Sequence, residues 1–320
     1  MRHGVQLALA ILACATPTAI LAQNTDAPPT WAYPMNPPGF KPPPDNGALR
    51  HVPGSTLSLT LSQVNDKFFT SDWHPDDHPS LPDVVAHGRK PNVLACGFCH
   101  RADGPGGPEA ADLMGLPEDY ILQQISDFKA GARKGAVPDR VPEKLMLSVA
   151  KAITADDAKA AATYFSSIKP RPIIRVVETD TAPKVHVTSW FLTALPGSER
   201  EPIGQRIIEV PDDPAQYISR DSRSHFTAYV PVGSIEQGKE LADSEDTALQ
   251  CGSCHGADLK GNESIPGIAG RSPTYLFRQL YDFKYGARSG PGAEIMKPIA
   301  EKLSVKDMVS LAAYASSLAP

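Results

Sequence analysis

The stretch CGFCH, residues 96–100, places two cysteines and a histidine within five positions. The same pattern returns as CGSCH at residues 251–255, 155 residues further along the chain. The sequence has five cysteines in all, and the fifth, Cys14, lies in an apolar run at the start of the chain. The other four cysteines therefore all belong to a Cys-x-x-Cys-His motif, and none of them is left for a structural disulfide.

The chain opens with MRHGVQLALAILACATPTAILAQ, a basic start followed by an apolar run that is too short to span a bilayer. This pattern predicts a signal peptide at residues 1–22, with cleavage after Ala22, and hence export to the periplasm, an oxidising compartment. Cleavage there removes Cys14. In an alternative interpretation, the sequence ILAC is a lipoprotein processing site, and Cys14 becomes a lipidated N-terminus.

Three chemistries use cysteines at this spacing. A thioredoxin-like dithiol needs a βαβ context and no histidine after the second cysteine. Zinc could be held by the four cysteines together, but each motif also offers a histidine and sits in its own repeat. In covalent haem attachment, both thiols add to the porphyrin vinyl groups and the adjoining histidine reaches the iron from one face. The duplicated motif favours two covalently bound haem c groups, attached at Cys96, Cys99, Cys251 and Cys254.

The repeat extends well beyond the cysteines. The segment LMGLPEDYILQQISDFKAGAR, residues 113–133, aligns with IAGRSPTYLFRQLYDFKYGAR, residues 268–288, at the same offset. Identical residues pair at positions that include Tyr120/Tyr275, Gln124/Gln279, Asp127/Asp282, Phe128/Phe283, Lys129/Lys284, Gly131/Gly286 and Arg133/Arg288. The two halves of the chain are therefore copies of one unit.

The repeat also selects a second axial ligand for each iron. A soft thioether sulfur suits haem iron. Of the six methionines, only Met146 and Met296 face each other in the two copies, once a five-residue gap is allowed in a loop that is longer in the first copy. The ordinary role of such a methionine is to fill a core, but the duplication favours axial ligation. With both axial positions filled, an iron has no open site for a substrate, which predicts outer-sphere electron transfer.

Most remaining elements of each copy are helical by pattern. Helices are expected ahead of each motif, over residues 82–90 and 233–242, and the second of these is expected to open with a capping box at Ser234. Alanine-rich closing helices are expected over residues 154–168 and 304–318, each beginning with a capping box. Each half therefore reads as a small helical domain.

This order of elements, with a methionine loop between the middle and closing helices, resembles class I cytochrome c, and its tandem form resembles the periplasmic dihaem cytochromes c. The resemblance covers about residues 82–169 and 233–320. It implies a mainly α fold with two tandem class I cytochrome c domains. A proline-rich N-terminal extension, residues 23–81, precedes them, and an inter-domain segment, residues 170–232, reads partly as β strands, for example in KVHVTSWFLTAL. These two segments are expected to wrap the domains or to form a docking surface for a partner.

The resemblance also implies how the haems are held and used. His100 and Met146 would ligate one iron, His255 and Met296 the other, and the two domains would face each other across a pseudo-twofold axis. The expected function is electron transfer between redox proteins, such as a dehydrogenase and an oxidase or reductase. The alternatives are a dihaem enzyme such as a peroxidase, with one open haem, and the cytochrome subunit of a dehydrogenase complex, associated with the membrane.

Charged residues add smaller expectations. Arg133 and Arg288 either neutralise haem propionates through charge-assisted hydrogen bonds or lie at solvated helix ends. His74 and His78 are expected in a turn-rich surface loop, although a metal site there is conceivable from the ligand types. The net charge of −5 favours a basic docking patch on the partner and gives no reason to expect nucleic acid.

Overall fold

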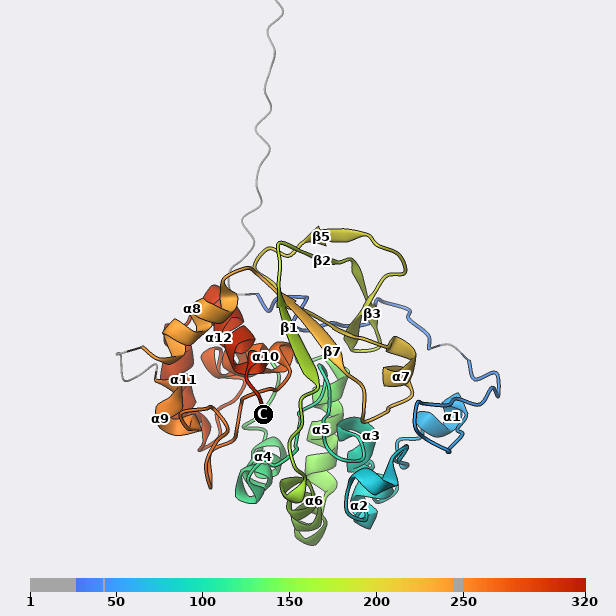
Figure 1. Ribbon diagram of the computed structural model, residues 1–320. Coiled ribbons are helices and arrows are strands. Elements are labelled where there is room, and N and C mark those ends of the chain that lie inside the picture. Colours follow the sequence, from blue (N-terminus) through green and yellow to red (C-terminus); the bar gives the residue numbers. More distant parts are fainter. Residues whose placement is uncertain (1–26, 43, 245–249) are drawn as a thin grey trace, which may run out of the picture.

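The computed structural model describes residues 27–42, 44–244 and 250–320 (Figure 1). The predicted signal peptide, its cleavage point and Cys14 lie outside the described residues. Among the residues that are described, no helix is both long and apolar enough to cross a membrane.

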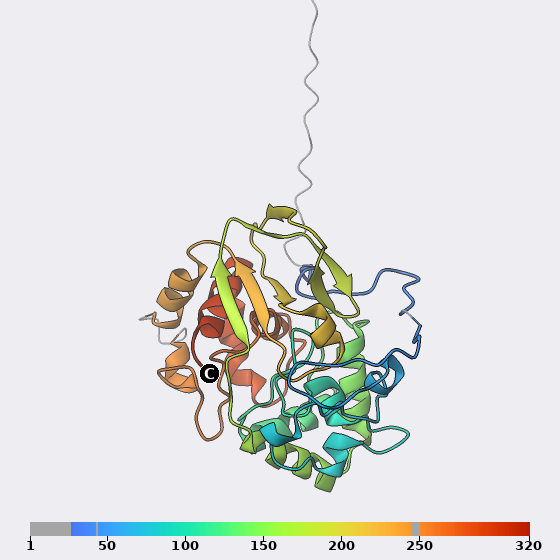
Figure 2. The same ribbon diagram turned by 45° about the vertical axis from the view of Figure 1, so that its right-hand side comes forward.

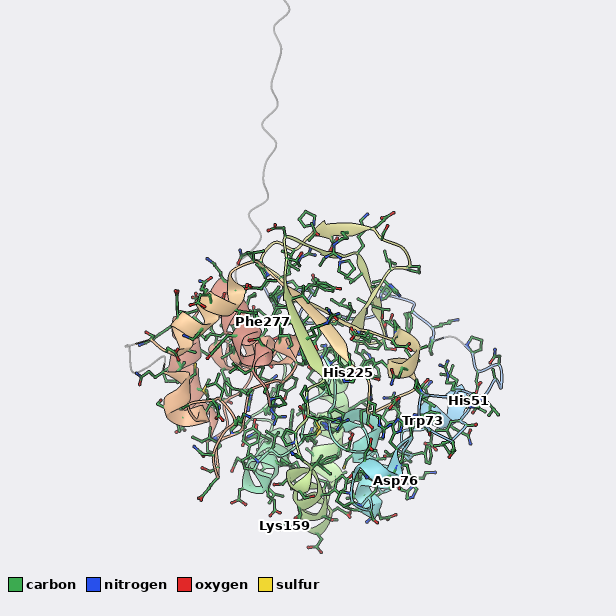
Figure 3. All side chains as sticks on the ribbon, in the orientation of Figure 1. His51, Trp73, Asp76, Lys159, His225 and Phe277 are labelled. Carbon is green, nitrogen blue, oxygen red and sulfur yellow. The ribbon has the colours of Figure 1, made fainter. Side chains whose placement is uncertain are left out.

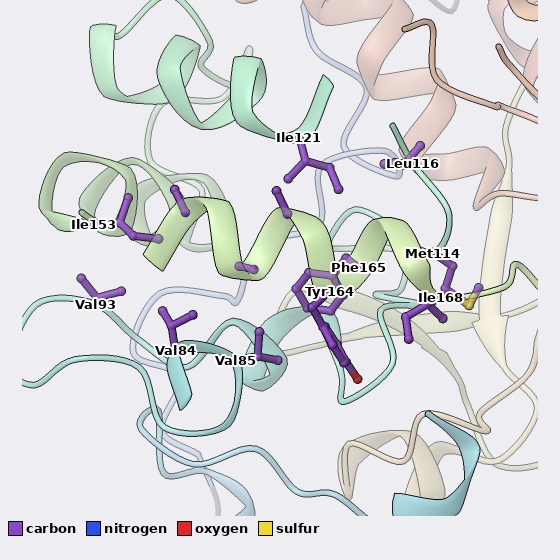
Figure 4. Close-up of a cluster of buried hydrophobic side chains, with 13 residues drawn as sticks. Val84, Val85, Val93, Met114, Leu116, Ile121, Ile153, Tyr164, Phe165 and Ile168 are labelled. Atoms are coloured by element: carbon purple, nitrogen blue, oxygen red, sulfur yellow. The ribbon is translucent and has the colours of Figure 1, made fainter. Parts of the chain in front are cut away.

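The first half is a bundle of helices that follow the motif order expected from the sequence. They are α2 (Asp83–Ala86), α3 (Cys96–His100), α4 (Glu118–Ala130), α5 (Val141–Ala152) and α6 (Ala155–Ser167). Helix α6 supplies much of the core, because its alanines let the chain approach closely while its aromatic side chains fill the centre of a buried apolar cluster (Figure 4). This cluster packs α6 against α4 and α2.

The second half repeats this arrangement with α8 (Ser234–Ala242), α9 (Cys251–His255), α10 (Pro273–Lys284), α11 (Ala293–Lys302) and α12 (Val305–Ser317). The closing helix α12 begins with the expected capping box, in which the Ser304 side chain accepts from the backbone of Asp307 and the Asp307 side chain accepts from the backbone of Ser304. In the first half, the Thr154 side chain accepts from the backbone of Asp157 in the same way, but the Asp157 side chain does not bond back to the backbone of Thr154, so the predicted capping box is only half formed.

Three local predictions are wrong. The helix expected over residues 82–90 is a single turn, because Gly88 takes a left-handed conformation (φ +63°) and its backbone lies so close to Val93 that an added Cβ would be 2.2 Å from the Val93 carbonyl oxygen. The capping box at Ser234 does not form, since Gly233 is the N-cap and Ser234 is already the first helical residue. The expected methionine loop is helical in both halves, because the strong helix formers around each methionine continue into α5 and α11.

The inter-domain segment contains the expected β structure, in three small sheets. The main sheet has the order β1 (Ile174–Glu178), β7 (Phe226–Val230) and β6 (Ile208–Pro211), with β1 parallel and β6 antiparallel to β7. Helix α7 (Pro214–Ile218) connects β6 to β7 and is capped by the side chain of Asp213. Figures 1 and 2 show this segment on one side of both helical halves.

The other two sheets are two-stranded and antiparallel. One pairs β2 (Thr181–Pro183) with β5 (Arg200–Pro202), and the other is a hairpin of β3 (Val185–Thr188) and β4 (Phe191–Ala194). The hairpin falls within the stretch KVHVTSWFLTAL, so the strand prediction from that stretch is confirmed.

The N-terminal extension crosses the molecule and contacts both the second half and the inter-domain segment. The ring of Trp31 lies 4.6 Å from that of Phe277 in α10, measured between centroids. Phe277 is labelled in Figure 3. Further along the extension, between the short helices α1 (Leu61–Val64) and η1 (Pro75–Asp77), the Trp73 indole donates to the backbone carbonyl of a buried serine in the inter-domain segment, at 2.7 Å.

The histidine pair of the extension is not in a solvated surface loop, so that prediction is wrong for His74. Its side chain is buried, and its Nε2 lies 2.9 Å from the carboxylate of Asp221. The Nε2 of His78 contacts Asp72 at 3.1 Å. The cause is the inter-domain segment, which packs over this part of the extension.

Candidate haem sites

A cavity of about 810 Å³ runs between the two helical halves, and both Cys-x-x-Cys-His motifs line it. Its wall is largely apolar, with side chains such as Ile121, Ile125 and Phe128 from α4 and Leu276 and Phe283 from α10. These apolar side chains of α4 and α10 therefore face the cavity. A cavity of this size and lining suits a large, flat, mainly apolar ligand.

The two motif histidines are held in the same way. The Nδ1 of His100 lies 2.8 Å from the carbonyl oxygen of Ala111, and the Nδ1 of His255 lies 2.8 Å from that of Pro266. Because a carbonyl can only accept, Nδ1 must be the protonated nitrogen, and Nε2 keeps its lone pair. Burial lowers the pKa of both imidazoles, which keeps them neutral. A neutral imidazole fixed through Nδ1 is the form that ligates a metal through Nε2.

The motif cysteines line the cavity as thiols, and no disulfide joins them. Burial raises the pKa of the Cys96 thiol to about 12 and also raises the pKa values of Cys99 and Cys251. A redox dithiol needs a lowered pKa to form the attacking thiolate, so this environment contradicts the dithiol interpretation. Within the described ranges, no three His, Cys, Asp or Glu side chains are grouped closely enough to hold a metal ion, which contradicts the shared zinc site.

Met146 in α5 and Met296 in α11 line the same cavity as the motif histidines. Met296 packs on Phe283, Ala293 and Ala300. Each half thus brings one imidazole and one thioether to the cavity from two different helices. The other two described core methionines, Met114 and Met308, are fully buried in the apolar clusters of their halves.

Arg133 and Arg288 are not at solvated helix ends. Both are buried between the halves, where their backbones form an isolated β bridge and their side chains cross over. Arg133 donates to Gln124 of its own half at 2.8 Å and to Tyr275 and Gln279 of the other half at 2.8 and 3.0 Å.

Arg288 mirrors these contacts by donating to Gln279 at 3.0 Å and to Gln124 at 2.8 Å. Sequence reasoning found all these residues as repeat matches but did not predict that they bind one another. The identity of these residues in the two copies could have indicated the pairing, because identical side chains of two copies that meet about a twofold axis can bind each other across it.

One interface residue was missed entirely. Arg271, just before α10, donates to the backbone carbonyls of Asp112 and Met114 at 2.9 and 3.0 Å and forms an ion pair with the Asp112 carboxylate at 3.0 Å. The matching position of the first half is Leu116, so the repeat gave no signal for it.

The residues therefore fit haem. Each half contributes paired thiols, a neutral imidazole fixed at Nδ1 and a thioether to the wall of the apolar cavity, and this donor set is that of a c-type cytochrome. The fold and the two sites define a dihaem protein of that class.

The comparisons with known proteins agree. The cytochrome c family model matches residues 235–319. The cytochrome c-554(548) of Halomonas halodenitrificans is 39% identical over 79 residues, covering 24% of this chain and 95% of that protein. The cytochrome c4 of Stutzerimonas stutzeri is 29% identical over 232 residues, covering 71% of this chain and 85% of that protein. A thiosulfate dehydrogenase electron acceptor of Thiomonas intermedia is 27% identical over 221 residues, covering 67% of this chain and 74% of that protein.

The chain belongs to the cytochrome c family. It is a cytochrome c4-like electron carrier with two covalently bound haem c groups, one for each Cys-x-x-Cys pair.

Proposed function

We propose that this protein is a periplasmic electron carrier built from two class I cytochrome c domains, residues 82–169 and 233–320. In this proposal His100 and Met146 ligate the iron of the first domain, and His255 and Met296 ligate that of the second. The observation that carries the proposal is that each half directs one imidazole and one thioether, from separate helices, into one cavity.

The haem supplies a one-electron couple, and the protein supplies everything that tunes it. The carbonyls of Ala111 and Pro266 fix the tautomer and orientation of the two histidines. The apolar wall excludes water, which lowers the reorganisation that a charge change would otherwise require. The thioethers would close the sixth positions, so that neither iron has a vacant site for bond-making chemistry.

The partners proposed are redox proteins. Relatives that are named as electron acceptors of a thiosulfate dehydrogenase support a dehydrogenase as the donor. The acidic net charge of −5 supports a basic patch on the partner and an encounter that weakens as salt is added.

The absorption spectrum of the holoprotein tests the ligand assignment. We expect Met146→Ala and Met296→Ala each to convert one low-spin haem of the two into a form that binds cyanide readily. Met114→Leu and Met308→Leu are the matched controls, since each removes a core thioether of one half without touching the cavity. If an alanine variant at Met146 or Met296 keeps the spectra and the potentials of both haems unchanged, the ligand assignment at that position is wrong.

A further inference from the structure

Among the described residues, other parts of the chain cover the first Cys-x-x-Cys-His turn but not the second. At Gly97 an added Cβ would lie 2.5 Å from the side chain of Thr70 in the N-terminal extension, and the neighbouring Phe98 is 3% exposed. At the matching Gly252 an added Cβ would meet only its own loop, at 3.5 Å, and the neighbouring Ser253 is exposed. The extra chain segments thus make two copied sites unequal.

The inter-domain segment places a cation at the covered turn. Arg220 donates from Nη1 to the carbonyl of Phe98 at 2.8 Å and from Nε to that of Val64 at 3.0 Å. Its guanidinium lies 3.7 Å from the centroid of the Phe98 ring. Arg220 also lines the haem cavity together with Cys99, which would carry one thioether bond to the haem.

A second cation comes from the motif itself. Arg101 follows His100 directly, is buried, stacks 4.6 Å from the centroid of the Tyr217 ring and directs Nη1 toward the carbonyl of Cys99 at 3.4 Å. Its backbone, at φ 69° and ψ 168°, lies in a region that almost only glycine occupies. The matching residue of the second half is Gly256, at φ 83° and ψ 153°. The first half therefore has a strained arginine where the second half has a glycine, which adopts this backbone conformation without strain.

These charges are not fully compensated. Glu109 lies 3.7 Å from Arg101 and accepts from the Tyr217 hydroxyl at 2.5 Å. Among the described residues, no carboxylate oxygen lies within 4.0 Å of an Arg220 nitrogen. Burial and the nearby Arg101 lower the pKa of Arg220 to about 10, which still leaves it charged at neutral pH. In the second half, Gly256 and Ser264 replace Arg101 and Glu109, so the matching positions carry no charge.

We propose that the arginine pair Arg101 and Arg220 raises the reduction potential of the first haem, so that the electron in the half-reduced protein resides there. One electron from a donor redox protein converts ferric to ferrous iron and lowers the charge of the site by one. Fixed cations nearby stabilise the reduced form relative to the oxidised form. This inference rests on the proposed electron-carrier function and adds a direction to it, because the haem of the covered first turn would hold the electron, while Ser253 of the second turn is exposed.

The test is a mediated redox titration of the holoprotein at low ionic strength, which needs no protein partner. We expect Arg220→Gln and Arg101→Gly each to lower one of the two midpoints and leave the other in place. A tenfold change in the one-electron equilibrium, about 59 mV, is the order expected for one buried charge. Ser264→Glu is the reference, because it puts a carboxylate at the second site, and it should lower the other midpoint.

Arg101→Gly also separates tuning from structural damage. It installs the residue that the second half uses at the same backbone conformation, so we expect the melting temperature to be unchanged or raised while the midpoint falls. If Arg220→Gln does not fold, this variant still decides the proposal. Unchanged midpoints in the arginine variants, equal shifts of both haems, or a shift of the midpoint that Ser264→Glu moves would each overturn it.

Failure of this inference is distinguishable from failure of the proposed function. If a haem lacks its methionine ligand, the wild-type spectrum reveals it before any arginine is changed. If instead both haems are low-spin and only the arginine variants show no effect, the electron-carrier function stands and the tuning by Arg101 and Arg220 does not.

Discussion

The hydrogen bonds that cross between the halves can be measured with a double-mutant cycle at Arg133 and Tyr275. Arg133 donates to the Tyr275 hydroxyl at 2.8 Å across 142 residues of sequence, inside a largely buried network. A hydrogen bond to a charged group contributes about 1.5–3 kcal/mol. For Arg133→Met, Tyr275→Phe and the double variant, we therefore expect a coupling energy of about 2 kcal/mol, measured by urea unfolding of the holoprotein.

Two further double-mutant cycles provide comparisons for this coupling energy. The symmetric pair Arg288 and Tyr120 also interacts electrostatically and should give a coupling energy of similar size. The pair Glu118 and Lys159 lies at the surface, with the lysine side chain 60% exposed, and should give about 0.5 kcal/mol. A coupling energy at Arg133 and Tyr275 no larger than that of the surface pair would refute the conclusion that the network holds the halves together.

Three other predictions concern stability. Burial raises the pKa of Asp282 from 3.8 to about 6, so the folded protein holds a proton that the unfolded chain releases, and the free energy of unfolding should fall by about 2 kcal/mol between about pH 4 and pH 6. Asp282→Asn should flatten that slope in urea unfolding at several pH values; a slope identical to that of the wild type would contradict the assignment. Trp73→Phe removes a hydrogen bond and ring volume and should cost about 3 kcal/mol in thermal unfolding, whereas a cost below about 0.5 kcal/mol would mean that the extension is not anchored there. Gly238→Ala places a Cβ 2.0 Å from the carbonyl oxygen of Ser310 and should destabilise the packing of α8 on α12 by about 1–3 kcal/mol, while Gly252→Ala, with 3.5 Å of clearance, should cost much less.

The haem motifs and the helical halves were predictable because their signals are local or repeated. The thioether-forming cysteines and the histidine must be adjacent in sequence to reach one porphyrin, and the closing helices begin with capping residues that act within one turn. The strands of the inter-domain segment were also visible as an alternating pattern. The predicted boundaries of elements were wrong where the conformation of a single glycine ended a helix, as at Gly88, or where strong helix formers continued a helix through the expected loop.

The sequence by itself determined the duplication, the two Cys-x-x-Cys-His motifs and which methionines correspond, since each of these is expressed as residue identity in aligned copies. Only the tertiary structure decided that Arg133 and Arg288 cross between the halves, that His74 is buried, and that Arg220 reaches the first motif. These contacts join residues more than a hundred positions apart, and nothing in a linear pattern specifies which distant surfaces meet. The two copies are similar as sequences and unequal as sites, because, among the described residues, the long segments around them cover only the first Cys-x-x-Cys-His turn.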